Sequence, residues 1–587
     1  MPNGYMGKIL RANLSTGELR TEEPDERLYR DYIGGYGIGA RLLYSEMSPG
    51  ADPLGPANIL GFATGPLTGT AALFGNRYTV FAKSPLTGGW GDANSGGDFG
   101  PALKFAGFDA VLISGVSSKP VYLLLDSGKA QLKDASHLWG RDSDETEDIL
   151  REEAGKKAQV ACIGPAGEKL SLIACVMNNK GRAAARSGLG AVMGSKKLKA
   201  VVAKGNLAVP LADGAGLKQA RLQAQKALGG PYLDLFRNYG TCGGTAQSAL
   251  SGDSPVRNWG GVGVVDFPTA ENLSGDRVIG YEAKKYGCWR CPVACGGLMK
   301  AVENDYQLEA RCHKPEYETL AAFGSNCGND NLESIIVAND ICNRYGLDTI
   351  SAGATIAFAI ECYENGLIDK RDTGGIELTW GNHRSIIAML EKLAKRDGFG
   401  DVLADGVKVA AAKIGKKAAE FAMHIGGQEV AMHDARLAPF FYPAYAYDAT
   451  PARHTQAFDM IHITNTAGLC MFGDVFGNAE HLVTYLNLAT GWNYSAEELS
   501  RINLRIHNLR HAFNLREGLN PGERAVHGRL TGHPPQTAGP LAGKSVDMEA
   551  MTAAYLAEKG WDPATFKPTK EKLLELGLDD LAEDLWP

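Results

Sequence analysis

Three cysteines stand close together in this sequence. Cys288, Cys291 and Cys295 fall in the segment CWRCPVAC, with the spacing C-x2-C-x3-C. Three thiolates at this spacing can converge on one inorganic core while the backbone N–H groups between them point toward its sulfur atoms, which suits an iron–sulfur cluster. Structural zinc sites usually combine two C-x2-C pairs. We therefore predict one iron–sulfur cluster, with zinc and chance buried cysteines as the alternatives.

The fourth thiolate of such a site has to come from a distant part of the chain. Cys470 is the best candidate, because it stands in NTAGLCMFGD, where flanking glycines allow the backbone to approach closely. Cys327, in the polar glycine-containing segment FGSNCGND, is the one other cysteine that we keep as a functional candidate. The isolated cysteines are expected to be small core side chains, namely Cys162, Cys175, Cys242, Cys312, Cys342 and Cys362.

Two glycine-rich segments combine backbone amides with basic side chains. One covers residues 74–100 and the other residues 178–205. Neither matches the GxGxxG or the P-loop pattern, but exposed N–H groups and arginines can bind phosphate without a standard nucleotide fold. They predict two phosphorylated cofactors or one cofactor with two phosphate arms, and the alternative is a pair of tight turns. Their side chains of interest are Arg77, Lys83, Asn94, Arg182 and Arg186.

Carboxylates and histidines follow the cysteine triplet. Glu316 and Glu318 flank a tyrosine in KPEYETL, and this spacing by itself is typical of a solvated helix start. The segment FAMHIGGQEVAMHDAR at 421–436 adds His424, Glu429, His433 and Asp434. A lone histidine is more often a core residue than a catalyst, so neither segment defines an active site by spacing alone.

The elements that hold these residues change character near residue 210. Before it, short apolar runs at 110–116, 121–125 and 199–205 are bounded by turn formers and predict strands. The similar segments GPLTGT (65–70) and SPLTGG (84–89) suggest a two-fold repeated β-architecture. After it, helical spacing dominates, at 217–228, 331–346, 350–366 and 385–398.

Length and composition limit the number of domains and the kinds of partner. A chain of 587 residues exceeds the roughly 250–300 residues of a single core, so we predict an α+β protein with three domains. These are a β-rich domain at 1–210, a helical domain with the cysteine triplet at 211–415, and a helical domain with Cys470 at 416–587. The formal charge of −7 argues against nucleic-acid binding.

Targeting and membrane segments are not expected. The N-terminus lacks the apolar core of a signal peptide, and no segment reaches the ~18 apolar residues of a membrane span. Eleven cysteines, an odd number, do not suggest a secreted disulfide framework. The expected compartment is the cytoplasm.

Taken together and in this order, the motifs resemble the aldehyde:ferredoxin oxidoreductase family of tungsten enzymes. The most specific segments are GRAAARSGLGAVMGSKKLKAV, CWRCPVAC, PEYETL, NRYGLDTIS and GLCMF. The resemblance runs from GKILRANLSTG at 7–17 to GWDPATFKPTKEKLLELGL at 560–578, nearly the whole chain. It implies a β-domain that forms a saddle for the cofactor, with two helical domains closing over it.

The resemblance also implies the cofactors. A tungsten or molybdenum ion would be held by the dithiolenes of two pyranopterins, whose phosphates Mg2+ would bridge, so that two pterins account for the two glycine-rich segments. A [4Fe-4S] cluster would be bound by Cys288, Cys291, Cys295 and Cys470. By position, the residues at the pterin phosphates would be Arg77, Asn94, Gly96, Arg182 and Ala183.

The chain departs from the family pattern near the pterins. Two D-x-x-G-L-(D/C) motifs become NRYGLD and NTAGLC, so Asn343 and Asn465 replace aspartates and lose the charge. Gly426 in HIGGQE replaces the lysine of the usual H-x-K-G-x-E. The remaining pterin contacts expected from the resemblance are Asp348, Gly468 and Leu469.

The implied reaction is oxidation of aldehydes to carboxylic acids with water as the oxygen source. The resemblance makes Glu316 the first candidate for the base that activates water and Glu318 the second, with His424 bonding or protonating the carbonyl oxygen. On this assignment, Glu316→Gln abolishes turnover and leaves the metals bound. Electrons would pass through the cluster to ferredoxin or a ferredoxin-like iron–sulfur subunit, and a flavin subunit would be needed for NAD. Homo- and hetero-oligomers both remain open.

Two rival functions are kept. One is the catalytic subunit of a tungsten-type benzoyl-CoA reductase, in which Cys327 could approach the metal. The other is a non-catalytic iron–sulfur carrier or zinc-stabilised scaffold, which metal analysis would distinguish from the enzyme. The sequence does not choose between tungsten and molybdenum.

Overall fold

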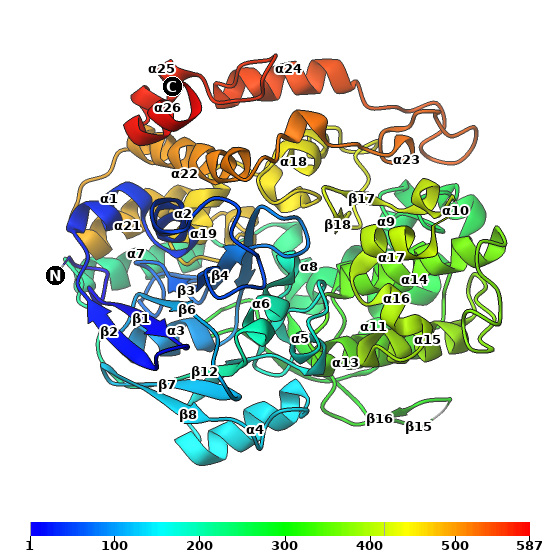
Figure 1. The fold of residues 1–587 in the computed structure, drawn as a ribbon, viewed down its shortest axis with the longest axis horizontal. Coiled ribbons are helices and arrows are strands. Elements are labelled where there is room, and N and C mark those ends of the chain that lie inside the picture. The colour runs from blue at the N-terminus through cyan, green and yellow to red at the C-terminus, as the bar shows by residue number, and fades with distance from the viewer. Residues whose placement is uncertain (1, 304, 416) are drawn as a thin grey trace.

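Two six-stranded sheets form the first part of the protein, which we describe from a computed structural model covering residues 2–303, 305–415 and 417–587 (Figure 1). The first sheet has the strand order β2-β1-β6-β3-β4-β5 and the second the order β11-β10-β9-β12-β7-β8. The first comprises β1 (Ile9–Asn13), β2 (Glu18–Glu22), β3 (Leu60–Thr64), β4 (Tyr78–Lys83), β5 (Trp90–Ser95) and β6 (Ala110–Ser114). The second comprises β7 (Val121–Asp126), β8 (Lys129–Asp134), β9 (Gln159–Cys162), β10 (Val176–Asn178), β11 (Arg182–Ala184) and β12 (Leu198–Lys204).

The two sheets repeat one topology. Adding six to each strand number of the first sheet reproduces the order of the second read in reverse. Each sheet begins with a hairpin, β1–β2 or β7–β8, and its first strand also pairs in parallel with its last, β1 with β6 and β7 with β12. Inner strands such as β3 and β4 are buried along their whole length, which explains their continuous apolar sequences. The predicted α+β class and the two-fold repeat are therefore confirmed.

The middle of the chain is helical and surrounds its own apolar core. Helices α13 (Leu332–Tyr345), α14 (Thr349–Glu364), α15 (His383–Lys395) and α17 (Gly406–Ile414) contribute most of it. The Asn331 side chain caps the start of α13 by accepting from the Ser334 N–H, and Gly346 ends the helix at φ 74°. The helices predicted at 331–346, 350–366 and 385–398 are thus confirmed, as is the one at 217–228, which is α7 (Gly214–Ala227).

The C-terminal helices close over the first domain. Helix α22 (Ala496–Arg516) packs against α2 (Gly35–Glu46), and α26 (Asp579–Leu585) covers α22 (Figure 1). The helical core of the middle region continues to Ala422, beyond the predicted boundary near 415, and Lys416 itself lies outside the described residues. The three-domain division stays a prediction. No helix in the described ranges is long and apolar enough to cross a membrane.

Candidate functional site

The cysteine triplet lies in the turn between two short strands, β13 (Glu282–Tyr286) and β14 (Gly296–Met299). Cys470 lies in the turn between α19 (Ile461–Thr466) and α20 (Phe472–Val475), where its N–H donates to the Phe74 carbonyl at 3.1 Å. These four cysteines are partly exposed free thiols, whereas the other seven are buried. Exposure thus separates the predicted cluster ligands from the core cysteines.

Arg77 connects the two cysteine segments. Its Nη2 donates to Cys470 Sγ at 2.8 Å. A Cβ built on Gly96 would lie 2.8 Å from Cys288 Sγ and 3.3 Å from the Arg77 guanidinium carbon, so only glycine fits there. Burial raises the pKa of Cys295 to about 12, and neighbouring Cys288 and Cys470 also raise it. The structure therefore brings the predicted quartet together.

The spacing of the sulfur atoms favours a cluster over zinc. Within the described ranges, two groups of carboxylates and histidines offer three ligand atoms within 4.8 Å of one another, and neither includes a cysteine. A tetrahedral zinc ion, with each sulfur about 2.3 Å away, would draw the sulfurs to within about 3.8 Å of one another. The cysteine sulfurs are farther apart than a zinc ion would require, and this spacing suits a larger inorganic core. Backbone N–H groups of Val293 and Ala294 also donate to Cys291, as cluster ligands usually require.

Buried arginine N–H groups surround the space next to the cysteines. Arg77 Nε, Arg182 Nε and Nη2, and Arg186 Nη1 are closed off from solvent and make no hydrogen bond within the protein. A buried guanidinium N–H without a partner is costly, so these groups fit an anionic ligand with several oxygen atoms. Phosphorylated pterins supply such oxygens. The arginines come from the loop before β4, from β11 and from the turn after it.

Three of the other predicted pterin-binding residues, Asn94, Asn465 and Gly468, lie close to Arg77. Asn94 accepts from Arg77 Nη1 at 3.2 Å, and its Nδ2 donates to Asn465 Oδ1 at 3.4 Å, so these two asparagines line the same space as Arg77. Gly468 has φ 86°, and a Cβ there would lie 2.0 Å from Thr68 Oγ1. The Gly468 carbonyl accepts from the Arg77 N–H at 3.0 Å.

The Asp348 carboxylate is already bonded to other groups of the protein. It caps α14 by accepting from the Ile350 N–H at 3.0 Å, and its Oδ2 lies 3.1 Å from Arg186 Nε. Leu469 is buried in the core. Ala183 pairs with Met177 in the second sheet, and Asn343 lies in the last turn of α13.

The two acids of PEYET have different environments. The Glu316 side chain is 41% exposed, accepts from the Thr241 hydroxyl, and lies 3.3 Å from Arg182 Nη1. Glu318, the second residue of α12 (Tyr317–Phe323), is 22% exposed, but its Oε1 is closed off from solvent, and burial raises the pKa of its carboxyl group. A raised pKa is the property expected of a carboxylate base, so the structure favours Glu318.

Two histidines face Glu318. Its Oε1 lies 3.7 Å from His433 Nε2 and 3.5 Å from His454 Nδ1, while its Oε2 accepts from the Met432 N–H at 2.8 Å. His433 Nδ1 in turn lies 2.8 Å from Asp253 Oδ2. The sequence marks His433 only as one of the polar residues of the 421–436 segment, and no local pattern marks Asp253 or His454.

His424 does not contact either acid. It pairs with Glu429 across a two-residue hairpin, and its Nδ1 accepts from the Gly427 N–H at 3.2 Å. Burial lowers its pKa to about 4, and the nearby Lys408 contributes, so the imidazole is neutral at pH 7. Cys327 donates to the backbone carbonyls of Ala322 and Gly353 inside the helical core, which makes it a core thiol.

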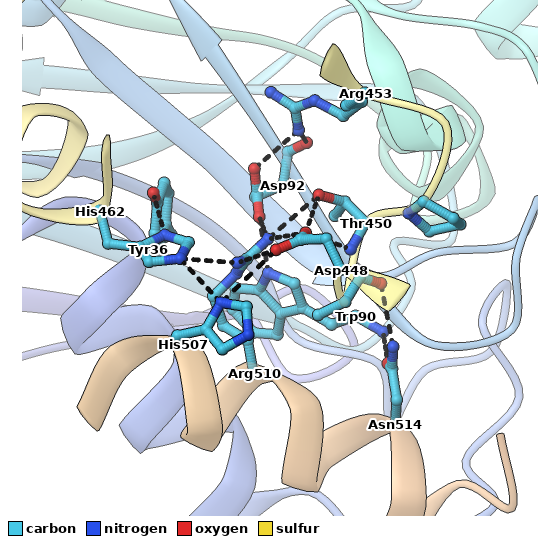
Figure 2. Close-up of polar contacts among 12 residues, drawn as sticks. Tyr36, Trp90, Asp92, Asp448, Thr450, Arg453, His462, His507, Arg510 and Asn514 are labelled. Carbon is cyan, nitrogen blue, oxygen red and sulfur yellow. Dashed lines mark hydrogen bonds and ion pairs between the residues drawn. The ribbon is translucent and has the colours of Figure 1, made fainter. Parts of the chain in front are cut away.

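A buried polar network around Arg510 is connected to Asn465 through Tyr36 (Figure 2). Arg510 is fully buried on α22, and its guanidinium bonds Asp92 and Asp448 at 3.0 Å. His462 links Tyr36 to His507, and Tyr36 accepts from Asn465. The group Asp448, His462 and His507 has metal-ligand spacing, but the Arg510 guanidinium already supplies its cation.

Comparison with known proteins agrees with this geometry. The family model described as aldehyde ferredoxin oxidoreductase, N-terminal domain, matches residues 9–205, and the model for domains 2 and 3 matches 219–464 and 456–578. The tungsten-containing aldehyde ferredoxin oxidoreductase of Pyrococcus furiosus is 37% identical, over 98% of this chain and 99% of that protein.

More distant relatives have other activities. The aliphatic sulfonate oxidoreductase, WOR-like subunit, of Pyrococcus furiosus is 29% identical over 99% of this chain and 98% of its own length. The active-site complex BamBC of benzoyl coenzyme A reductase with 1,5-dienoyl-CoA shares the fold, with a TM-score of 0.84 and 24% identity over 100% of this chain and 99% of that one. Family models and full-length relatives together show that the chain belongs to the aldehyde ferredoxin oxidoreductase family, a family of tungsten-containing enzymes.

Proposed function

We propose that this protein oxidises aldehydes to carboxylic acids with water, using a tungsten bis-pyranopterin and one [4Fe-4S] cluster. The observation that carries the proposal is the combination of an enclosed carboxylate, Glu318, with unpaired buried arginine N–H groups and a cysteine quartet. The name of the Pyrococcus relative, at 37% identity, supports the same activity. Molybdenum remains the alternative metal.

The chain's own residues would hold the cofactors. Arg77 and Arg182 would bind the pterin phosphates with the N–H groups that lack a protein partner, helped by Asn94 and the open backbone at Gly96. Mg2+ would balance the remaining phosphate charge. When bound, the metal group supplies a two-electron oxidant.

We assign the base role to Glu318 and not to Glu316. Glu316 is paired with Arg182, so its charge serves to orient a cofactor-binding arginine. Glu318 Oε1 is enclosed and has no hydrogen-bond donor, so it is free to accept a proton from water. Because Nδ1 of neutral His424 accepts from the Gly427 N–H, its proton is on Nε2, which can donate one hydrogen bond to the carbonyl oxygen, as the family resemblance suggests.

Electrons would leave through the cluster to ferredoxin or a ferredoxin-like subunit. Lys284 and Arg290 are exposed on the hairpin that carries the cysteine triplet, and they would favour an acidic partner. We expect Lys284→Glu with Arg290→Glu to raise the KM for ferredoxin severalfold at low salt, with less effect at high salt. Reduction of a small neutral dye by the same variant should be unchanged; an unchanged KM for ferredoxin would contradict the docking site.

The function is tested with the purified, metal-loaded protein. Short aldehydes and benzoyl-CoA are compared as substrates, in the direction each reaction requires, with a viologen dye as the electron partner. Aldehyde-dependent dye reduction, together with about four iron atoms and one tungsten per chain, would support the proposal. Turnover of benzoyl-CoA alone would favour the reductase that shares the fold, and zinc without tungsten would contradict both.

A further inference from the structure

Glu318, His433 and His454 point three polar atoms at one small space. Glu318 Oε1 and His454 Nδ1 are closed off from solvent, and neither has a hydrogen-bond partner. Their separation of 3.5 Å, and that of 3.7 Å between Glu318 Oε1 and His433 Nε2, are too long for direct hydrogen bonds. The three atoms instead converge within 4.8 Å of one another, so that a single water oxygen between them can bridge all three.

The protonation of His433 is set from its far side. Asp253 Oδ2 lies 2.8 Å from His433 Nδ1, and Asp253 Oδ1 accepts from the Asp434 N–H at 3.2 Å, so the carboxylate is held in place. Neutral His433 therefore carries its proton on Nδ1 and presents the Nε2 lone pair toward Glu318. Its ring also stacks on Tyr317, with the centroids 4.6 Å apart, which holds the imidazole plane.

We propose that these three side chains bind the water that attacks the aldehyde, and that Asp253 is a positioning residue that keeps His433 Nε2 as an acceptor. The water donates one O–H to Glu318 and the other to His433, and accepts from His454 Nδ1–H. One lone pair then remains free for the carbonyl carbon. This inference rests on the proposed function and adds His433, His454 and Asp253 to it.

Proton transfer follows this arrangement. As the water oxygen bonds to the carbonyl carbon, its O–H bond to the Glu318 side breaks and Glu318 takes the proton. When bound, the metal group would supply the two-electron oxidant that accepts the electron pair and proton of the aldehyde C–H bond, and the loss of these would leave a carboxylic acid. His433 Nε2 accepts the acid proton, and Asp253 stabilises the imidazolium. One water and one aldehyde thus give one carboxylate, three protons and two electrons.

The charges around His433 determine the expected pH dependence. Burial lowers the pKa of His433, but the bond to Asp253 and the charge of Glu318 outweigh it, so the net shift is upward. While His433 is protonated its charge lowers the pKa of Glu318, which burial raises; once His433 loses that proton, the neutral ring presents Nε2 as the acceptor for the water. The other groups facing this pair are His454, Arg186, Tyr317 and Tyr445.

The test compares His433→Gln, Asp253→Asn and the double variant with the wild-type holoenzyme. In the wild type His433 must lose its proton before Nε2 can accept from the water, so the His433 ionisation sets the acid limb of the kcat/KM profile. Without His433 the acid limb should instead follow the titration of the Glu318 carboxyl group, which loses a cationic neighbour and moves to higher pH. Rates should fall by at least about tenfold. Asp253→Asn should move the His433 proton from Nδ1 to Nε2, so that Nε2 can no longer accept from the water. It should therefore change the acid limb and the rates in the same way as His433→Gln. The double variant should be no worse than His433→Gln alone, because both changes disable one acceptor.

Controls separate this inference from the function and from stability. His511→Gln removes a buried histidine that stacks on Trp561, so it should lower stability without moving the acid limb. Infrared titration of the Glu318 carboxyl band, identified by its loss in Glu318→Gln, reports the Glu318–His433 coupling without turnover. An unshifted band in His433→Gln overturns the inference even if aldehydes are oxidised. A shifted band with no aldehyde oxidation instead rejects the function alone. One zinc or iron ion per chain that is lost in His433→Gln would show a metal site and also overturn the water site.

Discussion

Replacing Glu318 by Gln should reduce kcat/KM for aldehydes by about 10²- to 10⁴-fold, the usual range for loss of a general base. The amide keeps the size of the side chain and can still accept from the Met432 N–H, but it cannot take a proton from water. Tungsten and iron contents should match the wild type, because Glu318 bonds neither the cysteines nor Arg77 and Arg182, the residues that would hold the cofactors. Steady-state kinetics and elemental analysis on the same preparation measure both.

The matched control is Glu316→Gln, two residues earlier in the same motif. Glu316 pairs with Arg182 and is 41% exposed, so its loss should weaken cofactor retention and change kcat/KM by less than about tenfold per bound tungsten. A loss of turnover in Glu316→Gln with full metal content, and an active Glu318→Gln, would reverse the assignment and restore the expectation from family resemblance.

Replacing Arg510 by Met should lower the free energy of unfolding by about 3–5 kcal/mol, the cost of removing one partner from a buried ion pair. Arg510 is fully buried and its guanidinium bonds Asp92, Asp448 and Thr450, so methionine would leave enclosed Asp448 without its arginine and Asp92 with Arg453 alone (Figure 2). Urea unfolding and the thermal midpoint provide the measurement. A change below about 1 kcal/mol would mean that the pair contributes little.

The pairing of Arg510 with Asp448 should also make the free energy of unfolding depend on pH. Burial alone would raise the pKa of Asp448, but Arg510 and His507 lower it to about 2. Because the unfolded carboxyl titrates near 3.9, this stabilisation is fully present above about pH 4 and is lost as pH falls toward 2. Arg510→Met should lose most of that dependence. Arg371→Met, which removes an exposed pair with Asp369, should change the free energy of unfolding by less than about 0.5 kcal/mol.

Local patterns predicted much of this fold. The strands at 110–116, 121–125 and 199–205 and the helices from 331 to 398 appear where apolar spacing and turn residues indicated, because period and capping are properties of neighbouring residues. The repeated PLTG segments suggested a duplication, but both are loops of the first sheet, after β3 and after β4, so the repeat of the two sheets is seen only in their strand order. Ligands within a compact motif such as CWRCPVAC could be predicted from the sequence, since residues close in sequence stay close in space.

Tertiary structure decided which of the candidate residues act together. Glu316 and Glu318 are equivalent by spacing, and only packing against Arg182 on one side and two histidines on the other distinguishes them. Asp253 and His454 are 201 positions apart, and they meet near Glu318 because the helices of the middle and C-terminal regions fold over one another. By itself, the sequence determined the available ligands, the periods of the elements and the family. Burial and long-range contacts determined the protonation states, because desolvation and opposing charge come from residues that no local pattern connects.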